Sequence, residues 1–502
     1  MSVVSVDLLT IDLFEDIKIS PFLHSDIFCY CRDIDSFLKS TLSKFDISFR
    51  VSKILLQFTK FCITINHLIN LIINSQAYLN KFTMTIKTKH EKLTILHVAT
   101  LNRPIRPDLG YGPIETIIHN IDKGLHSLGH RSIVACSGDS RVSGEHYVTV
   151  DQSIGDYCSD DTPEGRKTMN MHLSRVLGRA KMGDIDVIHT HDAEAVEFIY
   201  DGVFSMHVPI VMTLHVPAKE SLLEGAYQRW CNPLSSPLVY CVPISEYQKR
   251  QYNDLVNTEN VVYHGIEVEE YPVKEEPDKG SYLFTIGRVT RDKGQDKAIE
   301  LAKKTGSKLI IAGCIQNKVA DKEFFAGLKN SIDLLVEVGK YPVDNDYYDR
   351  VIKPLLDCDK QIIYIGEISS EHKKKWYRHA RATLFAIQWD EPFGLVLIES
   401  MACGTPAIAF NKGAVPEIMV DGKTGFVVDS MSAMIGAVDR IDSIDPRECR
   451  RHVQNHFSIT IMAYKYSELY QQIVNDHKIS DSYSRLSTGH LSIPLHHGSI
   501  VT

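Results

Sequence analysis

Residues 93–129 read LTILHVATLNRPIRPDLGYGPIETIIHNIDKGLHSLG. The apolar run at residues 93–99 predicts a buried strand, and the loop after it carries Gly110 and Gly112. Pro113 suits the first turn of a helix, where its missing N–H costs nothing, and isoleucines and leucines then recur at helical spacing. This strand, loop and helix are the first unit expected of a parallel α/β domain.

The same alternation continues along the chain and restarts once. Further strands are expected at residues 132–136, 187–190, 209–215, 238–244 and 261–265. After an acidic stretch with two prolines, strands are expected again at residues 282–287, 308–313, 361–366, 382–387 and 406–410. Between the second and third of these strands, we expect a surface insertion at residues 318–340, whose apolar residues could form one amphipathic helix. Strands that alternate with helices pair in parallel through right-handed crossovers. The fold class is therefore α/β, with two doubly wound Rossmann-like domains that face each other across a cleft.

Shifts in composition set the expected domain limits. We expect an N-terminal extension at residues 1–89, an N-terminal Rossmann-like domain at 90–266, a linker at 267–280, a C-terminal Rossmann-like domain at 281–430, helices at 431–476 and a disordered tail at 477–502. Three interpretations stay open for the extension: a membrane-surface helix, a partner-binding arm, or sequence upstream of a true start at Met84. Because the first strand begins only after Met84, we expect residues 1–83 to be dispensable.

Charge and cysteine usage limit the classes of function. The 502 residues carry 55 Lys and Arg against 63 Asp and Glu, a net charge of −8 that argues against a nucleic-acid partner. The 11 cysteines lack the spacing of a zinc or redox motif, so we expect reduced thiols in a cytoplasmic protein. Residues 54–73 are the most apolar stretch, but polar side chains interrupt it, and we expect no transmembrane span there. Peripheral membrane contact stays open, and the sequence does not specify an oligomeric state.

The strongest chemical signal is residues 389–406, WDEPFGLVLIESMACGTP. A strand is expected to end just before Glu391, Gly394 to open a helix, and Glu399 to lie inside that helix. Backbone N–H groups and the positive end of the helix dipole would then face an anion, with a carboxylate on either side. Such an arrangement suits a ligand with phosphates in its middle and hydroxyl-rich sugars at both ends.

These two glutamates, with seven residues between them and Pro-Phe-Gly inside the interval, resemble a motif of the large retaining glycosyltransferase family. The family includes sucrose synthases, bacterial glycogen synthases and phosphatidylinositol mannosyltransferases. Its other landmarks stand in order: GYGPIE at 110–115, VIHTH at 187–191, TLH at 213–215, PIS at 243–245, HGI at 264–266, GRVTRDKG at 287–294 and GAVPE at 413–417. The resemblance implies a glycosyltransferase B-type fold. It also implies transfer of a hexose from a nucleoside diphosphate sugar to a hydroxyl of a small molecule or glycan.

The resemblance assigns roles to residues of the second domain. Arg288 and Lys293 resemble the pair that binds the donor's diphosphate, and fixed cations of this kind stabilise a departing phosphate without a metal. No metal, and no cofactor besides the sugar donor, is therefore expected. Glu391 resembles the carboxylate that faces the donor sugar, and Glu399 the one that holds the ribose hydroxyls. Three residues between them are implied to supply backbone groups to the sugar and phosphate: Phe393, Gly394 and Leu395.

The resemblance also assigns roles on the first domain. Gly110 and Gly112 are implied to let the backbone approach the diphosphate, although Tyr111 here separates glycines that are often adjacent in the family. His215 resembles the family histidine near the reacting carbon and an outer hydroxyl of the sugar. His191 is a further candidate for the site, and capping of its own strand is the alternative.

Three rival functions stay open on the same architecture: a sugar phosphorylase, a nucleotide-sugar epimerase and a non-catalytic nucleotide-sugar binder. Retention of both glutamates and of the basic pair argues against the binder. The donor loops look most like a bacterial subgroup that glucosylates small acceptors, including pterins, which favours glucose, with UDP-glucose as the donor. The Asp-Ile-Asp sequence at residues 184–186 has the spelling of a metal-binding motif, but it precedes a strand and is expected at the edge away from the site.

Overall fold

The first sheet has six parallel strands in the order β3-β2-β1-β4-β5-β6. The computed structural model describes residues 91–155, 162–204, 207–218, 236–253, 255–274, 276 and 282–488; the expected N-terminal extension and the end of the expected tail lie outside the described residues. The strands are β1 (Thr94–Val98), β2 (Arg131–Ser137), β3 (Glu145–Val150), β4 (Val187–Thr190), β5 (Ile210–Thr213) and β6 (Val239–Val242). Most are short apolar runs, because helices cover a parallel sheet on both faces.

The helices described around this sheet are α3 (Pro113–Ser127), α4 (Pro163–Ala180), α5 (Ala193–Phe204) and α8 (Glu246–Tyr252). Helix α3 buries Ile117, Ile121 and Leu125 against the sheet, which is the face that its periodicity predicts. The strand expected at residues 261–265 does not form. Val262 N donates to the carbonyl of Pro243, just beyond β6, so the segment makes isolated bonds and no regular ladder.

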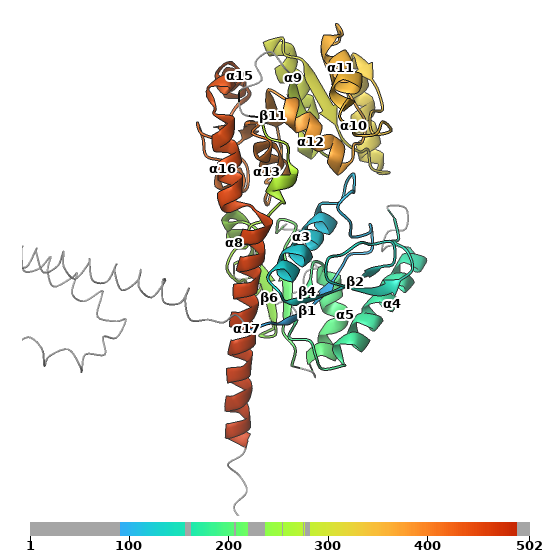
Figure 1. Ribbon diagram of the computed structural model, residues 1–502, viewed down its shortest axis with the longest axis vertical. Coiled ribbons are helices and arrows are strands. Elements are labelled where there is room, and N and C mark those ends of the chain that lie inside the picture. The colour runs from blue at the N-terminus through green and yellow to red at the C-terminus, as the bar shows by residue number, and fades with distance from the viewer. Residues whose placement is uncertain are drawn as a thin grey trace, which may run out of the picture. The chain divides into compact units, whose positions relative to one another are not determined.

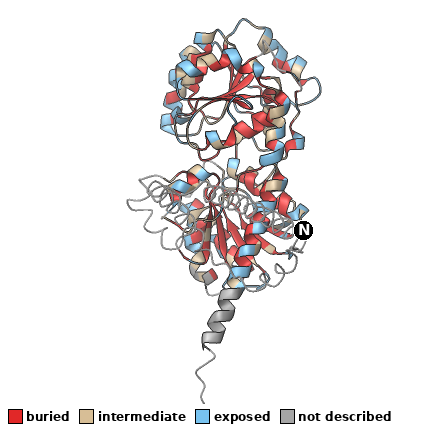
Figure 2. Cartoon of the chain, turned by 90° about the vertical axis from the view of Figure 1, so that its left-hand side faces the viewer, coloured by how far each residue is buried: buried red, intermediate tan, exposed pale blue. Residues whose placement is uncertain are grey.

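The second sheet has seven parallel strands in the order β13-β12-β11-β7-β8-β10-β9. Their bounds are β7 (Leu283–Ile286), β8 (Leu309–Ala312), β9 (Leu334–Leu335), β10 (Ile362–Tyr364), β11 (Ala382–Phe385), β12 (Ala407–Phe410) and β13 (Gly425–Val428). Helices α9 (Gln295–Thr305), α10 (Val319–Leu328), α11 (Lys353–Asp357), α12 (Ser370–His379), α13 (Leu395–Ala402), α14 (Val415–Ile418), α15 (Met431–Arg440) and α16 (Pro446–His456) accompany it, with short helical turns η1 (Val268–Glu270), η2 (Arg291–Lys293), η3 (Lys329–Ser331), η4 (Tyr348–Ile352) and η5 (Ile441–Ser443). Buried residues follow the strands of both sheets in Figure 2.

One expectation for this domain needs correction. The apolar residues between 318 and 340 predict one amphipathic helix, but α10 ends at Leu328 and Leu334 already belongs to the edge strand β9. Hydrogen bonds of Asp333 to β10 explain the difference. The Asp333 backbone N–H donates to Ile362 O at 2.8 Å, and its side chain accepts from Ile362 N at 2.8 Å. The segment therefore pairs with β10 as a strand, although its apolar residues have helical spacing. Within the expected linker, Val268 and Tyr271 are buried in the core of the second sheet, and the limits of the linker stay a prediction.

The last helix, α17 (Ile459–Thr488), returns to the first sheet, where it lies beside α3 (Figure 1). Gly124 of α3 permits the approach, since a Cβ at this position would lie 2.5 Å from the Cβ of Ala463. The tail that we expected to be disordered from His477 is thus helical as far as Thr488, because adding residues to an existing helix costs little. Neither α17 nor another helix of the described ranges is long and apolar enough to cross a membrane.

The described residues from 91 to 488 belong to one compact unit, and specific hydrogen bonds join its two domains. The carboxylate of Glu417, from α14 of the second domain, accepts from the backbone N–H groups of Glu246 and Tyr247 at the start of α8, at 2.7 and 2.6 Å. A second bond between the domains runs from Ser370 N, at the start of α12, to the carbonyl oxygen of Leu109, in the loop between β1 and α3, at 3.1 Å. These bonds hold the carboxyl edges of the two sheets on opposite walls of one pocket.

Candidate active site

A pocket of about 290 Å³ lies between the two domains. Its described lining includes Tyr111, His215 and His264 from the first domain, and from the second Gly287, Arg288, Lys293, Trp389, Glu391 and residues 393–396. Tyr111 follows β1, His215 follows β5, Arg288 follows β7 and Glu391 follows β11. The lining thus collects loops after the carboxyl ends of strands, where α/β sheets bind ligands.

The loop after β7 presents the two expected phosphate ligands. Arg288 Nη1 donates to Gln316 Oε1 at 3.1 Å, and the backbone carbonyl of Arg288 accepts from Gln295 Nε2 at 2.8 Å. Gly294 ends the loop with a φ of +70°, and a Cβ at this position would lie 1.9 Å from the carbonyl oxygen of Ala386. Only glycine fits there, so the loop is held tightly against the residue that follows β11.

Lys293 and Glu391 form an ion pair, with Nζ 2.7 Å from Oε2. Trp389 Nε1 donates to the same oxygen at 2.9 Å, and Lys293 Nζ lies 5.0 Å from the centre of the Trp389 ring. The Lys293 and Glu391 side chains are only 20% and 12% exposed, which strengthens their attraction. The sequence predicts contacts of these two residues with different parts of the donor, and the structure places them in direct contact.

Phe393, Gly394 and Leu395 line the pocket together, and their contacts with a donor stay a prediction. Gly394 is the N-cap of α13 and its carbonyl accepts from Leu397 N at 2.9 Å, so the backbone N–H groups of Leu395 and Val396 are the ones with no acceptor within the helix. Phe393 is buried, and its ring meets that of His264 edge to face at 5.0 Å between centroids. The positive end of α13 therefore faces the same space as Arg288 and Lys293.

Glu399 does not line the pocket. It lies a full turn inside α13 and is 5% exposed, with Oε1 2.5 Å from Lys373 Nζ and Oε2 accepting from Tyr377 OH at 3.1 Å. Tyr271 OH lies 3.5 Å from Oε1. Burial and the Glu399 charge raise the pKa of both tyrosines well above its usual range, so they stay hydrogen-bond donors. The role of Glu399 toward ribose stays a prediction.

Gly110 and Gly112 are also absent from the described lining, whereas Tyr111 between them is part of it. A Cβ on Gly110 would lie 3.0 Å from Glu367 Oε1, so this glycine approaches the second domain. Gly112 is the N-cap of α3. Burial raises the pKa of Tyr111 to about 12, although Arg288 opposes the shift, so its phenol can donate a hydrogen bond into the pocket.

The two candidate histidines are in contact. His191 follows β4, and its Nδ1 lies 2.9 Å from Nε2 of His215. The His215 ring stacks on that of His264, with centroids 5.4 Å apart. Burial lowers the pKa of His215 to about 3 and those of His191 and His264 well below 6.5, so all three are neutral at pH 7. Sequence reasoning quoted His264 and Trp389 within motifs but gave them no role.

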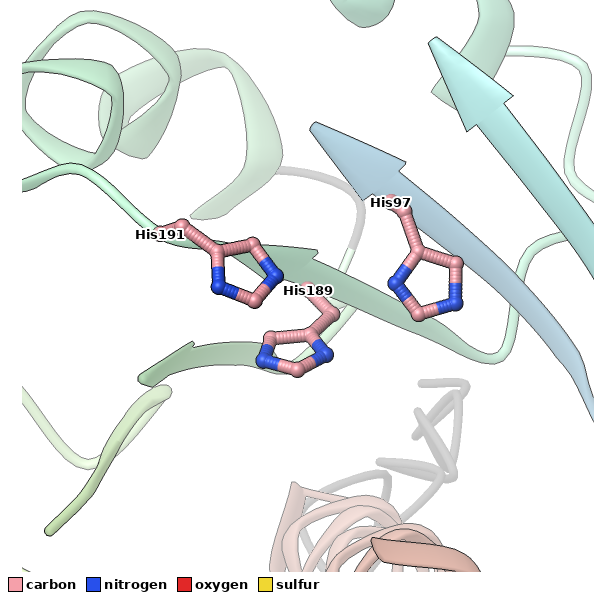
Figure 3. A group of neighbouring side chains, drawn as sticks. All are labelled: His97, His189 and His191. Carbon is pink, nitrogen blue, oxygen red and sulfur yellow. The ribbon is translucent and has the colours of Figure 1, made fainter. Parts of the chain in front are cut away.

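Three buried histidines, His97, His189 and His191, have ring nitrogens within 4.8 Å of one another; His97 lies on β1, His189 on the neighbouring strand β4, and His191 directly after β4 (Figure 3). Such a group can hold a metal ion. Both nitrogens of His189 are already bonded, however, to Thr213 Oγ1 at 2.8 Å and Tyr470 OH at 2.7 Å. Binding of a metal by all three would break one of these bonds, and the expectation that no metal takes part stays a prediction.

The Asp-Ile-Asp sequence lies at the opposite edge of the first sheet, immediately before β4. Asp184 pairs with Arg131 at 2.6 Å and Arg179 at 2.5 Å, and Asp186 Oδ2 accepts from Thr94 N at 2.7 Å. These contacts lower the pKa of Asp184, chiefly through the hydrogen bond from Arg179. Both acids are thus structural partners at the amino edge of the sheet.

Two protein families match the chain. Glycosyltransferase Family 4 matches residues 114–270, which hold β2 to β6 of the first sheet. Glycosyl transferases group 1 matches residues 267–452, which hold the whole second sheet. The boundary between the two matches falls at η1, where the first sheet has ended and the second has not begun.

Curated relatives are distant and most match only in part. The phosphatidyl-myo-inositol mannosyltransferase of Mycolicibacterium smegmatis is 22% identical over 268 residues, covering 51% of this chain and 63% of the relative. The alpha-1,3/1,6-mannosyltransferase ALG2 of Eremothecium gossypii is 24% identical over 387 residues, covering 68% of this chain and 73% of the relative. The chain thus spans less than two thirds of the mycobacterial relative's own length.

Solved structures share the fold. Sucrose-phosphate synthase from Thermosynechococcus elongatus has a TM-score of 0.56 at 17% identity, covering 77% of this chain and 100% of that chain. The Anabaena protein Alr3699/HepE in complex with UDP-glucose has a TM-score of 0.56 at 14% identity, covering 76% and 100%. The two Rossmann-like domains therefore have the glycosyltransferase B arrangement, and the expected fold class is confirmed.

Proposed function

Because the chain is a glycosyltransferase built from a family 4 and a group 1 domain, we propose that it transfers a hexose, with retention, from a nucleoside diphosphate sugar to a hydroxyl acceptor. One observation carries the proposal: Arg288, Lys293, Glu391 and the start of α13 line the same pocket as His215 of the other domain. Groups suited to a diphosphate thus lie beside a carboxylate and a histidine suited to a sugar.

The leaving group explains the positive side of the pocket. When the bond from the anomeric carbon to the phosphate oxygen breaks, the oxygen keeps the electron pair and negative charge grows on the diphosphate. Arg288, Lys293 and the first N–H groups of α13 are fixed near this charge and need no reorganisation to stabilise it. These groups can replace a divalent ion, so we propose metal-independent transfer with no cofactor besides the donor.

Retention follows if the acceptor attacks the face that the leaving group vacates. The acceptor oxygen then bonds to the anomeric carbon on that face, and its proton passes to the departing phosphate oxygen. No side-chain nucleophile is needed, so the role of Glu391 is to hold the sugar. A two-carboxylate hydrolase would need a second acid beside the leaving oxygen, and Glu391 is the one carboxylate among the described residues that line the pocket.

We propose glucose, carried by UDP, as the favoured sugar. One solved protein with this fold is a complex with UDP-glucose, while two curated relatives are mannosyltransferases, so a hexose donor is the shared feature. The acceptor is a hydroxyl of a small molecule or glycan. The cytoplasm suits the six cysteines of the described residues, which carry free thiols.

Binding and turnover of donors by the full chain test this proposal. Purified protein is first screened by thermal shift against UDP-, GDP- and ADP-hexoses, and donors that bind are then followed for release of nucleoside diphosphate. We expect one donor to raise the melting temperature and to be consumed. Three other results would contradict transfer. Donor consumption that requires free phosphate and pyridoxal phosphate would indicate a sugar phosphorylase, and conversion of the sugar without an acceptor would indicate an epimerase. Binding without turnover would indicate a non-catalytic nucleotide-sugar binder.

A further inference from the structure

The bond between His191 and His215 decides which nitrogen of His215 faces the pocket. Strands β4 and β5 pair in parallel, with Thr190 opposite Met212, so the two histidines emerge at the same edge of the sheet. His215 Nε2 is occupied by His191 Nδ1 at 2.9 Å. No hydrogen bond among the described residues occupies His215 Nδ1, which is the nitrogen left for a ligand.

The other nitrogen of His191 indicates where the proton lies. His191 Nε2 is buried and has no partner among the described residues. If His215 donated to His191, the proton of His191 would sit on Nε2 as a buried N–H without an acceptor. If His191 donates, only a lone pair is left without a partner, and unpaired buried N–H groups are the rarer of the two in proteins.

The surroundings of His191 keep its ring in this orientation. Its ring packs on that of His189 with centroids 4.5 Å apart. His189 is in turn fixed by hydrogen bonds to Thr213 Oγ1 at 2.8 Å and to Tyr470 OH of α17 at 2.7 Å. The His189 ring therefore cannot rotate without losing both hydrogen bonds, and it gives the His191 ring a fixed surface to pack on.

We propose that His191 is a positioning residue that donates from Nδ1 to His215 and thereby fixes the proton of His215 on Nδ1, as a hydrogen-bond donor facing the sugar. The proposal rests on the proposed function. A neutral imidazole that already carries its proton on the pocket side cannot remove the proton of the acceptor. This agrees with transfer of that proton to the departing phosphate, and it leaves His215 to donate to an oxygen of the donor sugar.

Three substitutions of His191 separate this role from simple packing. His191→Asn places an amide N–H near the former Nδ1 and keeps the donor, His191→Leu removes it, and His191→Asp offers only an acceptor and reverses the bond. We expect kcat within about threefold of wild type for His191→Asn, and a loss of about tenfold or more for the other two, with KM changed less. The matched control is His97→Leu, which removes another buried histidine without a bond to His215.

A tautomer measurement tests the proposal without relying on activity. The full chain is labelled with ¹⁵N-histidine, and His215 is identified by comparison with His215→Asn. Long-range ¹⁵N–¹H spectra should show the His215 proton on Nδ1 in wild type and His191→Asn, and on Nε2 in His191→Asp. A wild-type proton on Nε2, or equal kcat in His191→Leu and wild type, would overturn the proposal. If no donor is ever turned over, the proposed function fails while the spectrum still decides the tautomer.

Discussion

Lys293 Nζ lies 2.7 Å from Glu391 Oε2, so the expected phosphate ligand and the expected sugar ligand neutralise each other's charge. A donor that binds here brings two negative charges to Lys293 and hydroxyl groups to Glu391. Under the proposed function, binding of the donor would therefore exchange one ion pair for contacts of both residues with the ligand. The ion pair satisfies two charges that are both partly buried.

Removing the positive charges should slow transfer. Arg288→Ala and Lys293→Ala are each expected to lower kcat by about 10²-fold or more, because charge that grows on the diphosphate loses a fixed partner. Steady-state kinetics with the identified donor measures the effect. Lys297→Ala is the matched control, since Lys297 lies on α9 and pairs with Glu300 at 3.3 Å. Values within about threefold of wild type for both test variants would show that the phosphate assignment is wrong.

Neutralising Glu391 should have opposite effects on product binding and on turnover. In Glu391→Gln, Lys293 loses its partner and is free for phosphate, so the free nucleoside diphosphate should bind several-fold more tightly. Transfer should nevertheless fall, because the sugar loses a charged acceptor. Isothermal titration calorimetry with the nucleoside diphosphate and initial rates measure the two effects. Unchanged or weaker binding of the diphosphate would contradict the exchange of partners described above.

Glu399 should matter for stability as well as for nucleotide binding. Glu399→Gln leaves the Lys373 ammonium, 16% exposed, without its carboxylate, and a cost of about 1–3 kcal/mol in the free energy of unfolding is expected. Donor and free nucleotide should also bind more weakly, with kcat affected less. Urea denaturation of Glu399→Gln, Lys373→Met and the double variant separates the ion pair from the nucleotide contact. A fully stable Glu399→Gln would show that the buried pair contributes little.

Acid should destabilise the fold through its buried histidines. Burial lowers the pKa of His97 and His172 to about 4 and that of His215 to about 3, below the unfolded value of 6.5. The unfolded chain then binds more protons below pH 6.5, so the free energy of unfolding falls as the pH drops toward 4. Each such histidine contributes at most about 1.4 kcal/mol per pH unit. Urea denaturation at pH 7 and pH 5 measures the difference, and His97→Leu should reduce it. Equal stability at the two pH values would contradict this account.

Chelation should leave transfer intact. The described residues place Arg288, Lys293 and the start of α13 at the pocket, whereas Asp184 and Asp186 are committed to partners at the other edge of the sheet. Turnover in excess EDTA should therefore match turnover with added magnesium or manganese. Activity that EDTA abolishes and a divalent ion restores would assign a metal to the reaction.

Local patterns predicted the parts of the site that lie close together in the sequence. Residues 287–294 and 391–395 each combine a strand end, a glycine and a helix start, and the structure places both at the pocket. Contacts between segments that are far apart in the sequence have no such local pattern and could not be predicted from it. The bond from His191 to His215 depends on the pairing of β4 with β5, and the burial of Glu399 depends on Lys373 from another helix.

Two other contacts between distant segments could not be predicted from the sequence either: the pairing of the edge strand β9 with β10, and the return of α17 to α3. Asp333 binds β10 and turns an apparently helical segment into β9, which only the finished sheet can specify. Helix α17 crosses back to α3 because Gly124 leaves room for Ala463, a relation between positions more than three hundred residues apart. Amphipathic periodicity identifies which face of a helix is buried, but it does not identify the element that covers that face.

The anomeric configuration of the product tests the central claim most directly. The full chain is incubated with the donor that passes the binding screen and a hydroxyl acceptor, in the presence of EDTA, and the anomeric proton is followed by NMR from the first turnover. We predict that an α-linked donor gives an α-linked product together with one nucleoside diphosphate for each sugar transferred. A β-linked first product, or no transfer until a divalent ion is added, would contradict the account.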